Sequence, residues 1–307
     1  MSPLLKLDKH VLNVCYSPKY YADTHTNSME KLTVVAETLH QCPKVRFHAP
    51  APLDLDLLRQ LHDPDYVNAF LTGHPPKLAS MQGFKPWNEK LRDAILSINA
   101  GQICGAELAW KHGIAANIAQ GFHHASYQFG GAYCTFNGLA LVAQAFPDKK
   151  IFILDCDQHG GNGTAEFTLR LPNLFNFSIY GLAFGCPRYE RAETRHIHKK
   201  TGSYDEYQQA IHEGIAAAKA WGADLIIYQA GMDCHQADPF GSTWFTTELI
   251  AEREKLVFTL TKAHNFPVLF VLAGGYQKLS NLLELHLSTF RAAYQAYYND
   301  SLEFYLP

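Results

Sequence analysis

One segment of the chain has the residue types and the spacing of a metal site. An apolar run, Ile151–Leu154, leads directly into Asp155, Asp157 and His159 at alternate positions, and two glycines follow. Because alternate residues of a strand point to one face, we expect both carboxylates and the imidazole to leave the strand end together. Carboxylate oxygens and imidazole nitrogens are common ligands of divalent metals, so the segment predicts a metal site at the end of a buried strand.

Residues with a similar capacity for chemistry follow three other apolar runs. They are Gly121-Phe122-His123-His124, Gly231-Met232-Asp233 and Gly274-Gly275-Tyr276. In an open parallel sheet the carboxyl ends of the strands lie at one edge, so residues that are distant in sequence can meet there in one crevice. Each feature alone has an ordinary explanation as a cap, a turn or a packed aromatic ring, but their common position favours one shared site.

Asp157, His159 and Asp233 form the metal set that we predict. Two carboxylates and one imidazole leave coordination positions for water and for an oxygen atom of a substrate. Zn²⁺ is the expected ion, while Fe²⁺, Mn²⁺ and Co²⁺ stay open because geometry and supply decide among them. Asp155 is assigned to a neighbouring imidazole, whose tautomer it would fix. His235 is an alternative ligand, although we expect it at the rim.

The adjacent residues His123 and His124 are predicted to handle protons. On a regular strand their rings would diverge, so a turn must direct both of them toward the metal. Asp155 beside one ring would favour its imidazolium form, whereas neutral Asn162 would orient the other ring without raising its pKa as much. Two imidazoles with such different partners can divide the roles of electrostatic stabiliser and general base.

Tyr276 is expected to complete the site as a hydrogen-bond donor. The preceding glycines could let the chain bring the phenol over the metal, where it would stabilise a developing oxyanion. Metal, water, base and phenol together predict hydrolysis of an amide or ester without a covalent nucleophile. The sequence has no GxSxG elbow, and the loop Gly160–Thr164 lacks the lysine of a phosphate-binding P-loop.

The elements that must position these residues alternate between strands and helices. Strands are predicted at Val11–Tyr16, Ala115–Gln120, Ile151–Asp157, Leu174–Tyr180, Leu225–Gln229 and Val268–Ala273. Helices are predicted at Glu89–His112, Asp205–Trp221, Thr246–His264 and Leu279–Tyr297. The alternation indicates an α/β fold in which residues 1–307 form a single domain with a central, mostly parallel sheet and helices on both faces. The Gly- and Pro-bearing stretches 71–87 and 181–202 are expected to be loops at the rim of the site.

The composition narrows the class of protein. Hydrophobic residues make up 47% and charged residues 18% of the chain, as in ordinary globular enzymes. A formal net charge of −3 argues against nucleic-acid binding through a general basic field. Seven cysteines without a paired motif fit a reducing compartment, and no apolar run approaches the roughly 18 residues of a membrane span. We expect a cytoplasmic protein where it is synthesised, with action in a nucleus or after export left open.

The motifs described above resemble those of the zinc-dependent histone deacetylases of the arginase–deacetylase superfamily. The resemblance rests on GFHHA (121–125), DCDQHGGNGT (155–164), QAGMDCHQADP (229–239) and AGGY (273–276), in the family's order. It extends from about Tyr16 to Ala292, and it implies the arginase/deacetylase-like fold with the active site at the carboxyl ends of the strands. Three segments look most similar to the class IV group: residues 84–109, 253–258 and 274–278.

The resemblance implies a role for each residue of the site. Zn²⁺ would be held by Asp157, His159 and Asp233, and His123 paired with Asp155 would act electrostatically.

His124 would be the general base and later the acid, and Asn162 would orient it, although some family members have Asp at this position. Tyr276 would polarise the acyl carbonyl, and members that lack this tyrosine are poor deacetylases.

The resemblance also implies a structural K⁺ and a substrate tunnel. The K⁺ would be bound by the Ser178 hydroxyl and by main-chain carbonyls in its surroundings, which include those of Asp155, Asp157, His159 and Ile179. Tyr133 would form one aromatic wall of the tunnel, and Phe184 or a neighbour would form the opposite wall. A rim carboxylate that many relatives use to hold the substrate backbone has no secure counterpart in this sequence.

The expected activity is hydrolysis of the acyl amide on lysine side chains in proteins or peptides, such as histones, with acetyl or longer acyl groups. The alternatives are hydrolysis of acetylpolyamines or other small amides, and a non-catalytic acyl-lysine binding protein. An arginase-like ureohydrolase is disfavoured because a binuclear site needs more bridging carboxylates than residues 155–163 offer. A narrow tunnel rimmed by carboxylates would favour polyamines, whereas an open rim and an extended acyl pocket would favour proteins.

Overall fold

The described strands form one sheet in which every neighbouring pair runs parallel. The computed structural model describes residues 10–182, 185–241 and 243–304. The strand order across the sheet is β2-β1-β3-β8-β7-β4-β5-β6. The strands are β1 (Leu12–Cys15), β2 (Val45–His48), β3 (Ile114–Asn117), β4 (Ile151–Asp155), β5 (Leu174–Tyr180), β6 (Ala192–His196), β7 (Leu225–Ala230) and β8 (Val268–Leu272).

Burial across the sheet explains which strands the sequence predicts. Every residue of β4, β7 and β8 is buried, as expected for apolar runs in a parallel sheet that is covered on both faces. The predicted strand end at Asp157 is wrong, because β4 ends at Asp155 and the chain then turns. The sequence pattern also misses β2 and β6, the two edge strands, most of whose polar residues are partly exposed. β6 lies within the stretch 181–202, which was expected to be irregular.

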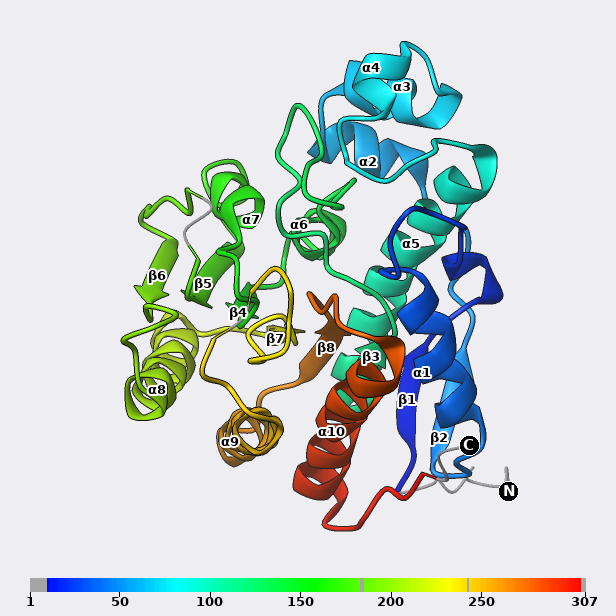
Figure 1. Cartoon of the computed structure of the whole chain (residues 1–307). Helices are drawn as coiled ribbons and strands as arrows, with labels where there is room; N and C mark the ends of the chain where they lie inside the picture. Colours follow the sequence, from blue (N-terminus) through cyan, green and yellow to red (C-terminus); the bar gives the residue numbers. More distant parts are fainter. Residues whose placement is uncertain (1–9, 183–184, 242, 305–307) are drawn as a thin grey trace, which may run out of the picture.

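Helices cover both faces of the sheet. Figure 1 shows α8, α9, α10 and α1 side by side on one face and α5, α6 and α7 on the other. The helices are α1 (Glu30–His40), α2 (Leu55–Leu61), α3 (Pro64–Thr72), α4 (Pro76–Ala79), α5 (Glu89–His112), α6 (Gly138–Ala145), α7 (Asn162–Phe167), α8 (Tyr204–Trp221), α9 (Thr247–Ala263) and α10 (Leu279–Tyr298). A single α/β domain with a parallel sheet therefore confirms the predicted fold class.

Local signals set the ends of the helices that the sequence predicts best. Asn88 accepts a hydrogen bond from the Leu91 amide at the start of α5, and Gly113, with φ of 85°, ends it. Ser203 and Glu206 form a capping box at the start of α8. The stretch 71–87 is not a loop throughout, because it contains the end of α3 and the whole of α4.

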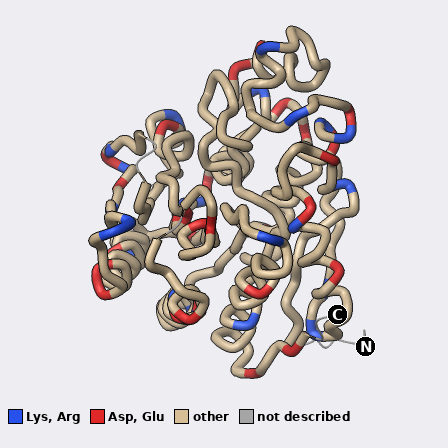
Figure 2. Tube along the Cα trace, viewed as in Figure 1, with Lys and Arg blue, Asp and Glu red and all other residues tan. Residues whose placement is uncertain are grey.

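Acidic and basic residues are interspersed around the periphery of the fold in the view of Figure 2. Among the described residues, no helix is both long enough and apolar enough to cross a membrane.

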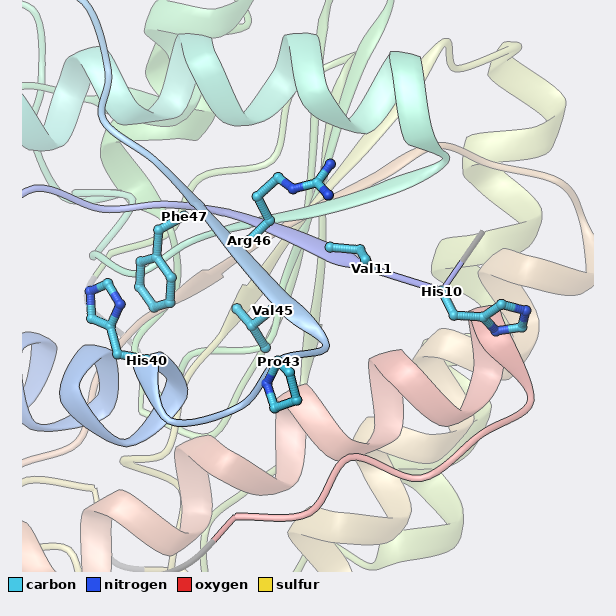
Figure 3. Close-up of a pocket in the computed structure, with 7 residues that line it drawn as sticks. All are labelled: His10, Val11, His40, Pro43, Val45, Arg46 and Phe47. Atoms are coloured by element: carbon cyan, nitrogen blue, oxygen red, sulfur yellow. The ribbon is translucent and has the colours of Figure 1, made fainter. Parts of the chain in front are cut away.

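A hollow of about 690 Å³ lies beside β1 and the edge strand β2 (Figure 3). It is lined by His10, Val11, His40, Pro43, Val45, Arg46 and Phe47, and the His40 ring stacks on Phe47 with a centroid distance of 3.6 Å. None of the residues predicted to do chemistry reaches it, so its size does not mark the candidate site.

Candidate active site

Asp157, His159 and Asp233 meet just beyond the ends of the adjacent strands β4 and β7. One ligand atom from each lies within 4.8 Å of the others. The Nδ1 atom of His159 is 2.9 Å from Asp233 Oδ2 and 3.3 Å from Asp157 Oδ1. The remaining carboxylate oxygens are held by main-chain amides: Asp157 Oδ2 accepts from Gly274, and Asp233 Oδ1 accepts from Gln158. These hydrogen bonds fix both carboxylates with one oxygen directed at the common centre.

The chemistry of this cluster suits a divalent cation. Asp157 is 3% and Asp233 0% exposed, so two carboxylates face each other out of water. Burial and the charge of Asp157 raise the pKa of Asp233 to about 7. Although burial opposes the shift, hydrogen bonds to both carboxylates raise the pKa of His159 to about 10. A cation between these groups would relieve the repulsion, and two oxygens and one nitrogen are donors that Zn²⁺ and related ions accept.

A turn after β3 brings both rings of the histidine pair to the site. Phe122 adopts a left-handed conformation with φ of 61°, which is rare for a residue with a side chain and typical of functional sites. The rings of His123 and His124 lie with centroids 4.0 Å apart, and the His124 ring lies 6.1 Å from that of His159. The turn that the adjacent histidines require is therefore present.

The two histidines have different partners. His123 Nδ1 donates to Asp155 Oδ2 over 2.7 Å, and His124 Nδ1 donates to Asn162 Oδ1 over 2.6 Å. Although burial opposes the shift, the Asp155 charge raises the pKa of His123 to about 8. Burial, with a further contribution from the neighbouring charge of His123, lowers the pKa of His124 to about 3. At neutral pH the His123 ring is therefore cationic, whereas the His124 ring is neutral and carries its proton on Nδ1 rather than on Nε2.

Tyr276 follows a tightly fixed turn after β8. A Cβ atom at Gly274 would lie 2.4 Å from Asp233 Oδ2 and 2.6 Å from Asp157 Oδ2, so a side chain at this position would crowd both carboxylates. Gly275 has φ of 144°, which also favours glycine. Burial and the charges of Asp157 and Asp233 raise the pKa of Tyr276 well above its usual value, so its phenol stays protonated and can donate a hydrogen bond.

A pocket of about 370 Å³ leads to these residues. It is lined by His124, Ala132, Tyr133, His159, Leu182, Phe240 and Tyr276. Tyr133 lies in this wall, with its ring 6.2 Å from that of Tyr276, whereas Phe184 falls outside the described residues. Leu182 and Phe240 were not anticipated. Phe240 is 55% exposed and packs edge-on against the Tyr276 ring, and such an exposed aromatic residue two positions after Asp238 carries no distinct sequence signal.

A smaller cavity of about 30 Å³ continues inward from the histidine pair and Tyr276. Its wall includes the buried Lys31, whose ammonium donates to the carbonyl of Ala273 and lies 5.9 Å from the Tyr276 ring centroid. Burial lowers the pKa of Lys31 to about 8. Lys31 was not anticipated either, and its only sequence signal is its position on the face of α1 that also carries the buried Leu32 and Val35.

Two further sequence expectations can be located in the structure. His235 Nδ1 accepts from the Ala237 amide, and its Nε2 lies 3.3 Å from Thr247 Oγ1, so the ring is engaged away from the cluster. Ser178 is paired in register with Asp155 across β4 and β5, and its hydroxyl accepts from the Gly161 amide. Ser178 thus neighbours Asp155, whose main-chain carbonyl is expected to share a K⁺ with the Ser178 hydroxyl.

Comparison with known proteins identifies the family. Residues 25–292 match the histone deacetylase domain. The chain belongs to the histone deacetylase family. An uncharacterized protein of Picosynechococcus sp. is 30% identical over 297 residues, which cover 92% of this chain and 99% of that protein. Family membership indicates a hydrolase of linear amides that depends on a metal ion.

Relatives of the chain within the family are named for different substrates. Histone deacetylase 2 of Arabidopsis thaliana is 30% identical over 59% of this chain and 49% of that protein. The acetylpolyamine amidohydrolase of Mycoplana ramosa is 28% identical over 60% of this chain and 58% of that protein. The chain thus spans only about half the length of these two relatives.

Solved structures in the histone deacetylase family share the fold. An acetylpolyamine aminohydrolase from Burkholderia pseudomallei superposes with a TM-score of 0.75 at 16% identity, covering 92% of this chain and 98% of that one. The HDA15 HD domain superposes with a TM-score of 0.76 at 18% identity, covering 93% of this chain and 90% of that one. At these identities the likeness concerns architecture alone.

Proposed function

We propose that this protein is a Zn²⁺-dependent deacylase that hydrolyses the amide of acyl-lysine in proteins or peptides. One observation carries the proposal: the pocket that leads to the Asp157–His159–Asp233 cluster has apolar and aromatic walls and no carboxylate among its described lining residues. An extended alkyl chain such as that of lysine fits such a wall, whereas a polyamine with further ammonium groups gains nothing from it.

The residues around the cluster can divide the work of amide hydrolysis. Asp157, His159 and Asp233 would hold the ion, which polarises a carbonyl and makes water more acidic. His124 accepts the proton of the attacking water at Nε2, since its Nδ1 proton is engaged by Asn162. The same proton then passes from His124 to the amine as the carbon–nitrogen bond breaks. The products are the lysine side chain with its amine restored and the carboxylate of the acyl group.

Tyr276 and His123 stabilise the negative charge that develops on the acyl oxygen, and neither takes up the proton of the attacking water. The protonated phenol of Tyr276 donates a hydrogen bond to the acyl oxygen as negative charge develops there. His123, kept cationic by Asp155, stabilises the same charge and prevents His124 from holding a proton before the reaction. His124 is therefore a base in the resting site and, once protonated, is more acidic than an ordinary imidazolium.

Hydrolysis of acetylpolyamines is the second candidate, because both a sequence relative and a solved structure with the same fold carry that description. A side-by-side assay separates the two. Purified Zn²⁺-loaded protein would be given acetyl-lysine peptides, longer acyl-lysine peptides and acetylspermidine at equal concentration. We expect peptide turnover to exceed acetylspermidine turnover at least tenfold in kcat/KM. The reverse order would reject the protein-directed proposal, and binding of peptide without turnover would identify a non-catalytic reader.

The remaining expectations belong to the same proposal. Ser178 and the carbonyls near Asp155 would bind K⁺, Zn²⁺ would be preferred over Fe²⁺, Mn²⁺ and Co²⁺, and the class IV group would be the nearest within the family. Histones remain a proposed partner among acylated proteins.

A further inference from the structure

The carboxylate of Asp238 joins the pocket rim to the turn that carries Tyr276. Asp238 is 1% exposed. Its Oδ1 atom accepts hydrogen bonds from the amides of Phe240 and Gly241 over 2.9 and 3.1 Å. Its Oδ2 atom accepts from the amide of Tyr276 itself over 2.7 Å. One buried side chain thus bonds to two segments that are far apart in sequence.

Burial of this carboxylate is stabilised by these hydrogen bonds. A buried ionised carboxylate is unfavourable unless its oxygens are paired, and three main-chain amides supply charge-assisted hydrogen bonds to it. Two of the three amides belong to the turn that follows Asp238, which an Asp in such a turn commonly stabilises. The third amide, that of Tyr276, takes no part in the turn that follows Asp238.

The Tyr276 turn needs an anchor at this point. Its other main-chain contacts hold neighbouring residues. The Ala273, Gly274 and Gln277 carbonyls accept from Lys31, Met232 and Asn27, and the Gly274 amide donates to Asp157. Gly275, directly before Tyr276, has a conformation that few other residues adopt and no side chain to restrain it. The bond from Asp238 therefore acts at the residue whose phenol must be fixed.

We propose that Asp238 is a positioning residue for the reaction: it holds the main chain of Tyr276, and through the Phe240 amide also the ring that packs against the phenol. The inference rests on the proposed deacylase function. Because a misplacement of about 1 Å can reduce turnover by roughly a hundredfold, an anchor without contact to substrate can have a large effect on rate.

Asp238→Asn tests this link with little change of volume. In the variant one carboxylate oxygen becomes an NH₂ group, which cannot accept the Tyr276 amide while the other oxygen serves Phe240 and Gly241. We expect kcat to fall roughly ten- to hundredfold, with KM changed less than about twofold and the bound Zn²⁺ unchanged. Asp54→Asn is the matched control, because exposed Asp54 also accepts a main-chain hydrogen bond but lies at the start of α2.

A double-mutant cycle distinguishes positioning from general stability. If Asp238 acts through the phenol, Asp238→Asn should reduce kcat less than about twofold in a Tyr276→Phe background. An equal loss in both backgrounds, a loss of Zn²⁺, or an unchanged kcat in the single variant would overturn the inference.

Amide hydrogen exchange in the unaltered protein gives a reading that does not require the variant to fold. The Tyr276 amide should be protected to a degree similar to the amides of β8, and rapid exchange would contradict the anchor.

The activity assays of the variants also separate this inference from the proposed deacylase function. Inactivity of both the unaltered protein and Asp54→Asn on every acyl amide would reject the deacylase function and this inference with it. Activity that persists in Asp238→Asn would reject the inference alone.

Discussion

His123 and His124 lie with ring centroids 4.0 Å apart, and their pKa values are shifted in opposite directions. The difference between the two pKa values comes from the residue to which each Nδ1 atom donates. Asp155, the partner of His123, carries a negative charge, whereas Asn162, the partner of His124, carries none. Two buried imidazoles in contact disfavour a second proton, so the proton resides on the ring beside the carboxylate. This relationship makes the pH dependence of turnover informative.

Turnover should decline at alkaline pH as His123 loses its proton near pH 8, whereas neutral His124 should remain a competent base down to acidic pH. Asp155→Asn removes the charge that raises the pKa of His123. The alkaline limb of the kcat profile should therefore move to lower pH in this variant. The check is a kcat profile from pH 5 to 10 for both proteins, and coincident alkaline limbs would exclude His123 as the group that titrates.

Tyr276→Phe should lower kcat by roughly a hundredfold or more while the bound metal stays constant, since only the donor to the oxyanion is lost. Tyr133→Phe is the comparison, because that ring lines the same pocket and its hydroxyl has no proposed role in the reaction. Steady-state kinetics and metal analysis of both variants provide the test. Equal losses in the two variants would contradict a specific role for the Tyr276 phenol.

Metal binding should stabilise the fold as well as support turnover. Removing the ion with a chelator should abolish activity, and Zn²⁺ at about 100 times its Kd should stabilise the protein by about 2.7 kcal/mol. The reason is that Asp157 and Asp233 face each other out of water. Thermal unfolding with and without Zn²⁺ measures this, with Asp233→Asn as the control. An identical response in that variant would mean that Zn²⁺ binds elsewhere.

Gly274→Ala should impair the metal site without any change in a ligand. The added Cβ would approach carboxylate oxygens of Asp233 and Asp157 to 2.4 and 2.6 Å, so the ligands or the turn must move. Gly131→Ala is the matched control, because no atom lies within 4 Å of a Cβ built there. Zn²⁺ titration of both variants should show weaker binding only for Gly274→Ala. Unchanged affinity would show that the turn can relax.

The protein should lose stability in mild acid through His62. This buried ring donates from Nδ1 to the Ser126 carbonyl and accepts the Asn137 amide at Nε2, and burial lowers its pKa to about 4. The unfolded chain, with a His pKa of 6.5, binds this proton more readily, so stability falls as pH decreases from about 6.5 to 4. His62 should account for about 2 kcal/mol of the loss between pH 7 and 5.

Urea unfolding of His62→Gln at the two pH values provides the comparison for this prediction. The variant should be less stable at pH 7 but should show a smaller loss on acidification. A pH dependence equal to that of the unaltered protein would assign the effect to other groups.

The elements and residues that the sequence predicts are those with a local signature. β5 has the predicted bounds because most of its residues are apolar and all of them are buried, and α5 has them because Asn88 and Gly113 mark its ends. The convergence of the histidine pair with the metal cluster follows from residue types at the ends of parallel strands. Their assigned roles remain predictions.

What the sequence does not reveal depends on distant main-chain atoms. Asp238 lies within a recognised motif, but its partner is the amide of Tyr276, and an amide is present in every residue except proline. Lys31 likewise binds the carbonyl of Ala273. Edge strands β2 and β6 are missed because one side of each lacks a neighbour and their residues need not be apolar.

The site is built on four consecutive strands of the sheet, β3, β8, β7 and β4, and this order has a consequence for folding. The pairing of β3 with β8 joins Ile114 to Val268, a contact of very long sequence separation. Such contacts form slowly because the intervening chain must first be brought together. In a refolding experiment, helical signal should therefore return before enzymatic activity, and activity should report completion of the centre of the sheet. No fragment that lacks either partner strand should be active.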